Sequence, residues 1–239
     1  VTIGFYFYLA QSHLEAPFED VRSGLFRAFS EWSAEKVEEL PEASERAWKP
    51  NLLVPVGEDR NLPGSFEFLR NLAYPTGTVK LVEFSEDWIE ASQKDQLRDL
   101  SKQFRREGIF SSRAYLEEEN FQEGVILSMI LSAGFFGPNT LCLELPRYHH
   151  PRDEDLREII DKAWHFSLGV YLLCTPEQWS AGGETINIWI SDMSPDWEPE
   201  DLPVSLDLAL LTGYILRRNW QGGMNVICGI EDEEYEEKI

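Results

Sequence analysis

The stretch Asn51-Leu-Leu-Val-Pro-Val56 decides the fold class, because it is a short apolar run that a turn-rich segment follows. A helical pattern comes next over 66–72, and 78–84 then has the pattern of a second strand. This order of strand, turn and helix recurs along the chain. Apolar strands that alternate with helices indicate an α/β fold, with a mainly parallel sheet covered by helices on both faces.

The same alternation continues to the end of the chain. Helices are predicted at 97–104, with Gly108 as cap, and at 121–133, 156–164 and 203–218. Strands are predicted at 109–115, 140–145, 168–174, 185–191 and 224–230. Ile130 and Trp164 lie on predicted core faces, and the helix at 203–218 is apolar on nearly every side, which predicts burial. The strand residues expected in the core are Leu52, Val54, Leu81, Leu143, Tyr171, Ile188 and Ile227.

The composition indicates a globular, strongly acidic chain. Its 239 residues include 43 acidic and 21 basic side chains, a net charge of −22 that disfavours binding to nucleic acids and to anionic lipid surfaces. No apolar run is long enough to span a bilayer alone. The chain has an odd number of cysteines, and each lies in an apolar run; they are Cys142, Cys174 and Cys228. This pattern favours buried free thiols in a reducing compartment.

The first nine residues, Val1-Thr-Ile-Gly-Phe-Tyr-Phe-Tyr-Leu9, are aromatic and uncharged. They lack the basic start and the cleavage pattern of a signal peptide. Two interpretations stay open on this stretch alone. It is either an edge strand of the domain or the last turns of a transmembrane helix that leaves the bilayer through an aromatic belt.

The segment from Pro17 to Leu40 has the pattern of an amphipathic helix, with acidic residues near its start and Pro41 after it. Leu25, Phe29 and Trp32 lie on its apolar side. Since a lone helix would not keep such a face in water, we predict that these three residues contact the domain, a second subunit or a membrane part.

The sequence contains no motif for catalysis or for metal binding. A P-loop, a Rossmann glycine motif and a nucleophile elbow are all missing. His149 and His150 are adjacent, so their side chains point in different directions and do not form the paired face that a metal requires. Carboxylate pairs are common merely because the chain is acidic. We therefore expect no catalytic residue, no metal site and no cofactor.

Two loops are candidate binding sites. Gly134-Phe-Phe-Gly-Pro-Asn-Thr140 lies between a predicted helix and a predicted strand, and a plain turn is favoured there over nucleotide contact. If a nucleotide did bind, its contacts would come from Gly134, Gly137, Asn139 and Thr140. The loop at 192–203 carries Trp197 among acidic residues and prolines, and a surface loop is favoured there over a cover for a small-molecule site.

Four local patterns, in order along nearly the whole chain, resemble the C-terminal domains of cation-chloride cotransporters. Trp48-Lys-Pro-Asn-Leu-Leu-Val54 is similar to the family's first strand, and 134–141 is similar to its glycine-rich turn before an Asn-Thr strand. Ile186-Asn-Ile-Trp-Ile190 resembles a later strand, and 206–218 has the family's leucine-rich and then basic helix. Each pattern alone is weak, but their order and spacing together are specific, and a prokaryotic member is expected.

The resemblance implies two α/β subdomains similar to universal stress proteins, a homodimer, and a membrane part in the same polypeptide. It favours a membrane exit for 1–11, a connector at 12–47, a first subdomain at 48–166 and a second one at 167–239, cut short after Ile239. Lipid contact is expected only for Val1 to Leu9. The stress-protein nucleotide signature is incomplete, since Arg147-Tyr148-His149 occupies the place of its second glycine cluster.

The expected function is a non-catalytic regulatory and dimerisation domain at the cytoplasmic face of the cell membrane. Its membrane part would carry chloride with potassium, sodium or both. The alternatives are a soluble, stress-protein-like nucleotide-binding sensor or enzyme, and a small-molecule sensor that uses the 192–203 loop.

Overall fold

The structure is a computed structural model that describes residues 24, 26–32, 49–56, 62–85, 91–118, 120–133, 137–145, 153–174, 185–190 and 204–228. The chain divides into two compact units, Val1–Trp48 and Lys49–Ile239. In the first unit, 26–32 are helical. The second unit contains the strands and helices of the predicted α/β fold.

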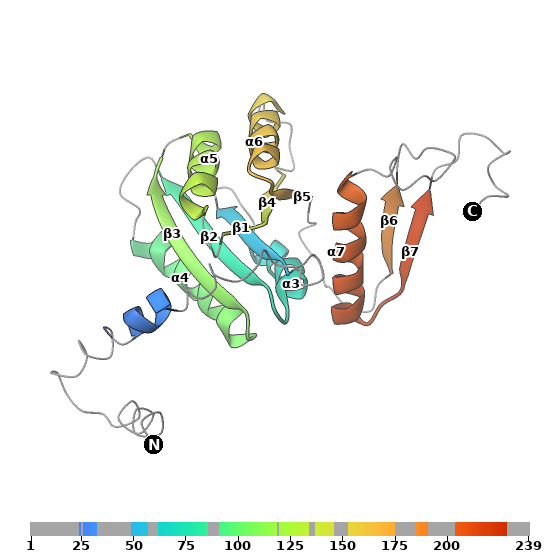
Figure 1. Cartoon of the computed structure of the whole chain (residues 1–239), viewed down its shortest axis with the longest axis horizontal. Coiled ribbons are helices and arrows are strands. Elements are labelled where there is room, and N and C mark those ends of the chain that lie inside the picture. Colours follow the sequence, from blue (N-terminus) through green and yellow to red (C-terminus); the bar gives the residue numbers. More distant parts are fainter. Residues whose placement is uncertain are drawn as a thin grey trace, which may run out of the picture. The chain divides into compact units, whose positions relative to one another are not determined.

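Five parallel strands form the main sheet of the second unit (Figure 1). In chain order they are β1 (Asn51–Val56), β2 (Thr78–Ser85), β3 (Phe110–Glu117), β4 (Thr140–Glu144) and β5 (Gly169–Leu173). In space the order is β3-β2-β1-β4-β5, so the direction of winding reverses between β1 and β4. The predicted parallel sheet is confirmed.

Helices cover both faces of this sheet, as the apolar strands predict. One face is covered by α3 (Leu62–Ala73) and α4 (Ala91–Arg106), and the other by α5 (Phe121–Ser132) and α6 (Asp153–His165). Gly108 follows α4 with a φ of 81°, and the Ile109 N–H donates to the Phe104 carbonyl at 3.0 Å. The predicted left-handed glycine at this helix end is therefore confirmed.

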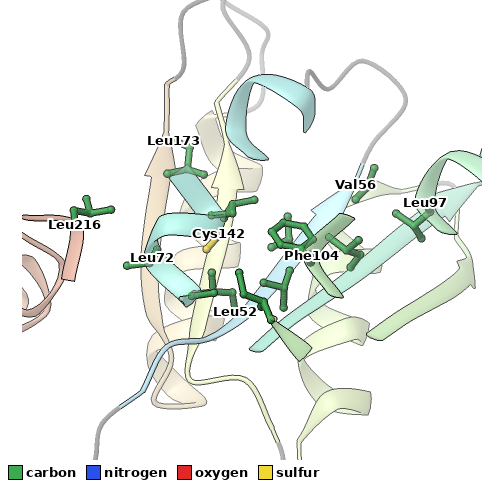
Figure 2. Packing of buried hydrophobic residues seen from close by; sticks show 14 residues of the cluster. Leu52, Val56, Leu72, Leu97, Phe104, Cys142, Leu173 and Leu216 are labelled. Carbon is green, nitrogen blue, oxygen red and sulfur yellow. The ribbon is translucent and has the colours of Figure 1, made fainter. Parts of the chain in front are cut away.

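The core is split by the sheet into two clusters, because neighbouring residues of a strand point to opposite faces. Leu52, Phe104 and Cys142 belong to the cluster under α3 and α4, which Figure 2 shows from close by. Leu53 and Leu143 belong to the cluster under α5 and α6. Burial is confirmed for five of the seven predicted strand residues, whereas Tyr171 and Ile227 are only partly buried; the five are Leu52, Val54, Leu81, Leu143 and Ile188.

The last part of the chain forms a second, two-stranded parallel sheet, β6 (Ile186–Ile190) and β7 (Met224–Cys228). The helix α7 (Val204–Trp220) covers one face of it, with Leu206 packed among Ile188 and Ile190. The strand β5 pairs with β4 in the five-stranded sheet. Residues 169–173 thus lie in the first sheet, although the sequence analysis assigned 167–239 to the second subdomain.

The helix α7 packs against elements of both sheets. Leu216 joins the cluster under α3, and the hydroxyls of Thr212 and of Tyr171 in β5 are hydrogen-bonded to each other. The Asn219 side-chain amide donates to the backbone carbonyls of Asn71 and of Tyr74 at the end of α3. The second sheet is therefore tied to the first through one helix.

Further sequence-based predictions of burial were wrong for α7 and for Cys174. The helix α7 is not largely buried, because two of its sides pack on neighbours while a third side, with Leu211 and Tyr214, faces solvent. Cys174 is exposed, since it follows the last residue of the edge strand β5, whereas Cys142 is buried as predicted. Burial in an apolar cluster raises the pKa of the Cys142 thiol, which disfavours its reactive thiolate form.

Candidate interaction surfaces

The weak nucleotide candidates Asn139 and Thr140 lie at the start of β4, where a network of hydrogen bonds joins neighbouring strands. The Asn139 Oδ1 accepts from the Asn51 N–H at 2.9 Å, and the Asn139 Nδ2 donates to the Lys49 carbonyl at 2.8 Å. The Thr140 hydroxyl donates to the Asn139 Oδ1 at 3.0 Å, and Thr78 donates to the Asn51 Oδ1 at 3.0 Å. The Asn139 side chain thus acts as a backbone clamp between β1 and β4.

This position differs from the usual ligand site of such a fold. Asn51, Thr78 and Thr140 are the first residues of parallel strands, so they lie together at the amino edge of the sheet. Ligands of open α/β sheets bind at the opposite edge, outside the carboxyl ends of the strands, where the winding reverses. Gly137 is partly buried near the clamp, and Gly134 lies outside the described residues. The geometry gives Asn139 and Thr140 a structural role.

Replacing Asn139 by Ala should lower the free energy of unfolding by about 1–3 kcal/mol, because the change leaves the Asn51 N–H without its acceptor. Asn225→Ala is the matched control, since it removes only an exposed contact to the Asn187 Oδ1 at 3.1 Å, and it should cost less than about 0.5 kcal/mol. Urea unfolding followed by circular dichroism gives both values. If both substitutions lowered the free energy of unfolding equally, the clamp would contribute nothing to stability.

At the carboxyl edge, the reversal point between β1 and β4 carries a carboxylate. Ser65, in the first turns of α3, is buried, and its hydroxyl donates to the Glu144 Oε1 at 3.3 Å. A helix N-terminus at this place is where phosphate groups bind in dinucleotide-binding folds. The negative charge of Glu144 opposes such a ligand. The loops that follow β1 and β4, at 57–61 and 146–152, lie outside the described residues.

Among the described residues, no group of three or more His, Cys, Asp or Glu side chains is arranged to hold a metal ion. His165 ends α6 and is exposed. The other histidines, His13, His149 and His150, lie outside the described residues, as does the 192–203 loop.

The predicted connector face is exposed where the structure describes it. Of its predicted residues, Phe29 and Trp32 have 62% and 54% of their surfaces accessible, and their rings lie 5.8 Å apart. Phe26, which the prediction does not include, is 58% exposed. On the same helix, Arg27 and Glu31 form an exposed ion pair at 3.6 Å. Leu25 lies outside the described residues. Phe29 and Trp32 are thus available for a contact, as the sequence analysis proposed.

A second apolar surface was missed by the sequence analysis, which placed Ile130 and Trp164 in the core. Both are exposed, Trp164 at 69%, and α5 also exposes Leu127 and Leu131. The signal was present in the sequence: from Gly124 to Ser132 the helix carries no charged residue on any side. A helix on a sheet buries only one side, so an all-apolar helix must leave apolar side chains outside.

Within the described parts of the chain, no helix has the length and apolar character needed to cross a lipid bilayer. Two apolar surfaces are exposed, the connector face and the outer side of α5. An exposed apolar patch of this kind marks a site of interaction with another surface.

Comparison with known families and structures agrees with this fold. Residues 54–180 match the family "Prokaryotic cation-chloride cotransporter, C-terminal domain, 1st", and residues 182–239 match the second such domain. The crystal structure of the cytoplasmic domain of a prokaryotic cation chloride cotransporter is 35% identical, with a TM-score of 0.64, over 80% of this chain and 70% of that one. No curated protein matches.

A structure of a functionally unknown protein from Pseudomonas aeruginosa PAO1 is also similar, at 16% identity and a TM-score of 0.51, over 75% of this chain and 60% of that one. This second likeness bears on the fold alone. The two family matches and the 35% identical structure together cover both sheets. The chain belongs to the prokaryotic cation-chloride cotransporters, and it corresponds to their C-terminal cytoplasmic domain.

Proposed function

We propose that the chain is the non-catalytic regulatory and dimerisation domain of a symporter that carries chloride with potassium, sodium or both through its membrane part. The observation that carries this proposal is the exposure of Phe29 and Trp32 on the connector helix. The connector precedes the α/β unit in the chain and is expected to follow the membrane part. A contact made by the connector would therefore act on the link between these two parts.

The charge of the chain limits where two copies can meet. With a net charge of −22, most of the surface repels a second copy. The aromatic face of the connector is uncharged. Burying a large apolar side chain that was fully exposed before the contact formed stabilises that contact by about 1.5–3 kcal/mol. Two aromatic side chains that are more than half exposed therefore offer a useful part of a dimer's binding energy.

Replacing Phe29 and Trp32 together by Ser should weaken self-association by at least about tenfold, because roughly 1 kcal/mol of apolar burial is lost at each position. The association constant is measured by sedimentation equilibrium across a concentration series. Arg27→Gln on the same helix is the matched control, since it removes one member of an exposed ion pair and leaves the aromatic face intact.

Circular dichroism of each variant shows whether the α/β unit stays folded. If the unchanged chain remains a monomer at high concentration, dimerisation of this domain is wrong. If the double substitution unfolds the core, the aromatic face packs within the domain and the connector has no separate role. In the complete transporter, the same substitution should alter the transport rate while leaving membrane insertion unchanged.

The alternative of a soluble nucleotide-binding sensor or enzyme gains no support from the described residues. Asn139 and Thr140 are engaged in the clamp at the amino edge, and Glu144 places negative charge at the carboxyl edge. The 192–203 loop, on which the small-molecule sensor depends, lies outside the described residues.

A further inference from the structure

We propose that an open hollow at the C-terminal end of α7 binds a phosphate group. Tyr214, Arg217, Arg218, Gln221 and Gly222 line this hollow. Two guanidinium groups, a phenol and a side-chain amide thus surround it, and all of them can donate hydrogen bonds. Among the residues that the structure describes, no carboxylate lines it, although acidic residues outnumber basic ones by 43 to 21 in this chain.

Among the described residues, the two arginines differ from Arg70 and Arg98, which form ion pairs, and resemble Arg157, for which no ion pair is found. Arg98 lies 2.8 Å from Asp95, and Arg70 lies 3.9 Å from Glu107. Neither Arg217 nor Arg218 forms an ion pair within the part of the chain that the structure describes, and both are exposed. Their positive charge is therefore available to an anion from solvent.

The backbone brings these side chains to one place. Tyr214, Arg217, Arg218 and Gln221 follow each other at steps of three, one and three residues, so their side chains extend from neighbouring positions at the end of the helix. Gln221 then has a φ of 56°, in the left-handed region, and Gly222 follows it at the turn into β7. The turn thus supplies Gln221 and Gly222 to the lining of the hollow.

The end of α7 is also held in place. The Asn219 side chain donates to the Tyr74 carbonyl at 2.9 Å and to the Asn71 carbonyl, which ties the last turn of α7 to the end of α3. Leu216 is buried one turn earlier. Arg217 and Arg218 thus extend from a fixed backbone, which lowers the entropy that a ligand would have to remove.

A phosphate group fits this donor set better than chloride does. The planar guanidinium fork matches two oxygens of an oxyanion at once, whereas a spherical chloride receives no such paired contact. At neutral pH a phosphate ester also carries a charge of about −1.5 to −2, which two arginines can balance. Free phosphate, a soluble phosphate ester and a lipid headgroup share this chemistry.

Arginines in the last turn of a helix also have an ordinary structural role, because positive charge there balances the helix dipole. That role requires no ligand and predicts only a loss of stability on substitution. The phosphate proposal predicts in addition a saturable response to phosphate that depends on both arginines. The two roles are therefore separated by experiment.

The test is an NMR titration of the full ¹⁵N-labelled chain with inorganic phosphate. Sodium chloride keeps the ionic strength constant. We expect saturable backbone shifts at Tyr214, Gln221 and Gly222, with a dissociation constant on the order of 1 mM. Arg217→Gln combined with Arg218→Gln should weaken this binding at least tenfold. Arg157→Gln, which removes an exposed arginine from α6, is the matched control and should leave it unchanged.

Three outcomes would overturn the proposal: no saturable shift, shifts of equal size in the double variant, or a lower melting temperature of the double variant with an unchanged phosphate response. If phosphate binds, glycerol phosphate and vesicles that contain phosphatidic acid identify the source. Tight binding to the vesicles alone assigns the hollow to a lipid headgroup, and binding of glycerol phosphate assigns it to a soluble ester. Both results support a phosphate site.

Discussion

Leu143→Ala is expected to lower the free energy of unfolding by about 2–5 kcal/mol, the range measured for truncation of a buried leucine. Leu143 is 1% exposed and lies in β4, in the cluster that α5 and α6 cover. Its neighbours come from strands on one side and helices on the other, so the structure cannot easily collapse into the cavity that the alanine leaves. Urea unfolding followed by circular dichroism measures the change.

Leu131→Ala makes the same chemical change on the outer side of α5, where the side chain is 62% exposed. It should cost less than about 0.5 kcal/mol, because little apolar surface is returned to water and alanine is a better helix former. The contrast between the two leucines therefore tests the placement of both. Similar costs at the two positions would mean that one of them is misplaced in the structure.

Gly77→Ala should destabilise the chain by about 2–4 kcal/mol, because the new methyl group would meet backbone atoms that cannot turn away. The added Cβ would lie 2.7 Å from the Ala73 carbonyl oxygen and 2.9 Å from the Ala73 Cα, and it would also strike the Pro50 carbonyl oxygen. That last oxygen accepts the Thr78 N–H at 3.0 Å, so relief of the clash would disturb the start of β2.

Gly108→Ala is the matched control for this second prediction. A Cβ at Gly108 meets no atom within 4 Å, and only its φ of 81° opposes a side chain. The expected cost is about 1 kcal/mol, the usual strain of alanine in the left-handed region. A larger loss at Gly108 than at Gly77, measured by the same urea unfolding, would contradict the close approach of α3 and β1 around Gly77.

The main sheet was predictable from the sequence because β1 and β4 are apolar along nearly their whole length and the strands alternate with helices. Leu52 and Leu143 could be assigned to the core on this pattern, since each lies in a run with no polar side to turn outward. The apolar side of the connector was also recognisable, because Leu25, Phe29 and Trp32 follow each other at helical steps. The sequence predicts a contact for this side, and it does not reveal that Phe29 and Trp32 are exposed.

Periodicity shows which residues share a face, but it does not show what covers that face. Trp164 was placed on the apolar stripe of α6 and is nevertheless exposed, although its neighbour Ala163 is fully buried. Likewise, no local pattern reveals that β5 pairs with β4, or that Asn219 in α7 donates to the Tyr74 carbonyl. Such facts depend on contacts between distant segments.

The shared position of α7 has a consequence for how this region can be inherited. The two family matches meet between residues 180 and 182, yet α7, from the second, supplies Leu216 to the cluster of the first and bonds to Tyr171. A recombination event at that border would join the first half of one protein to the α7 of another. The side chains of that helix would not have evolved to pack on this first half. The two halves should therefore descend together, and a chimaera of two transporters would be better joined before Lys49, where the chain divides into its compact units.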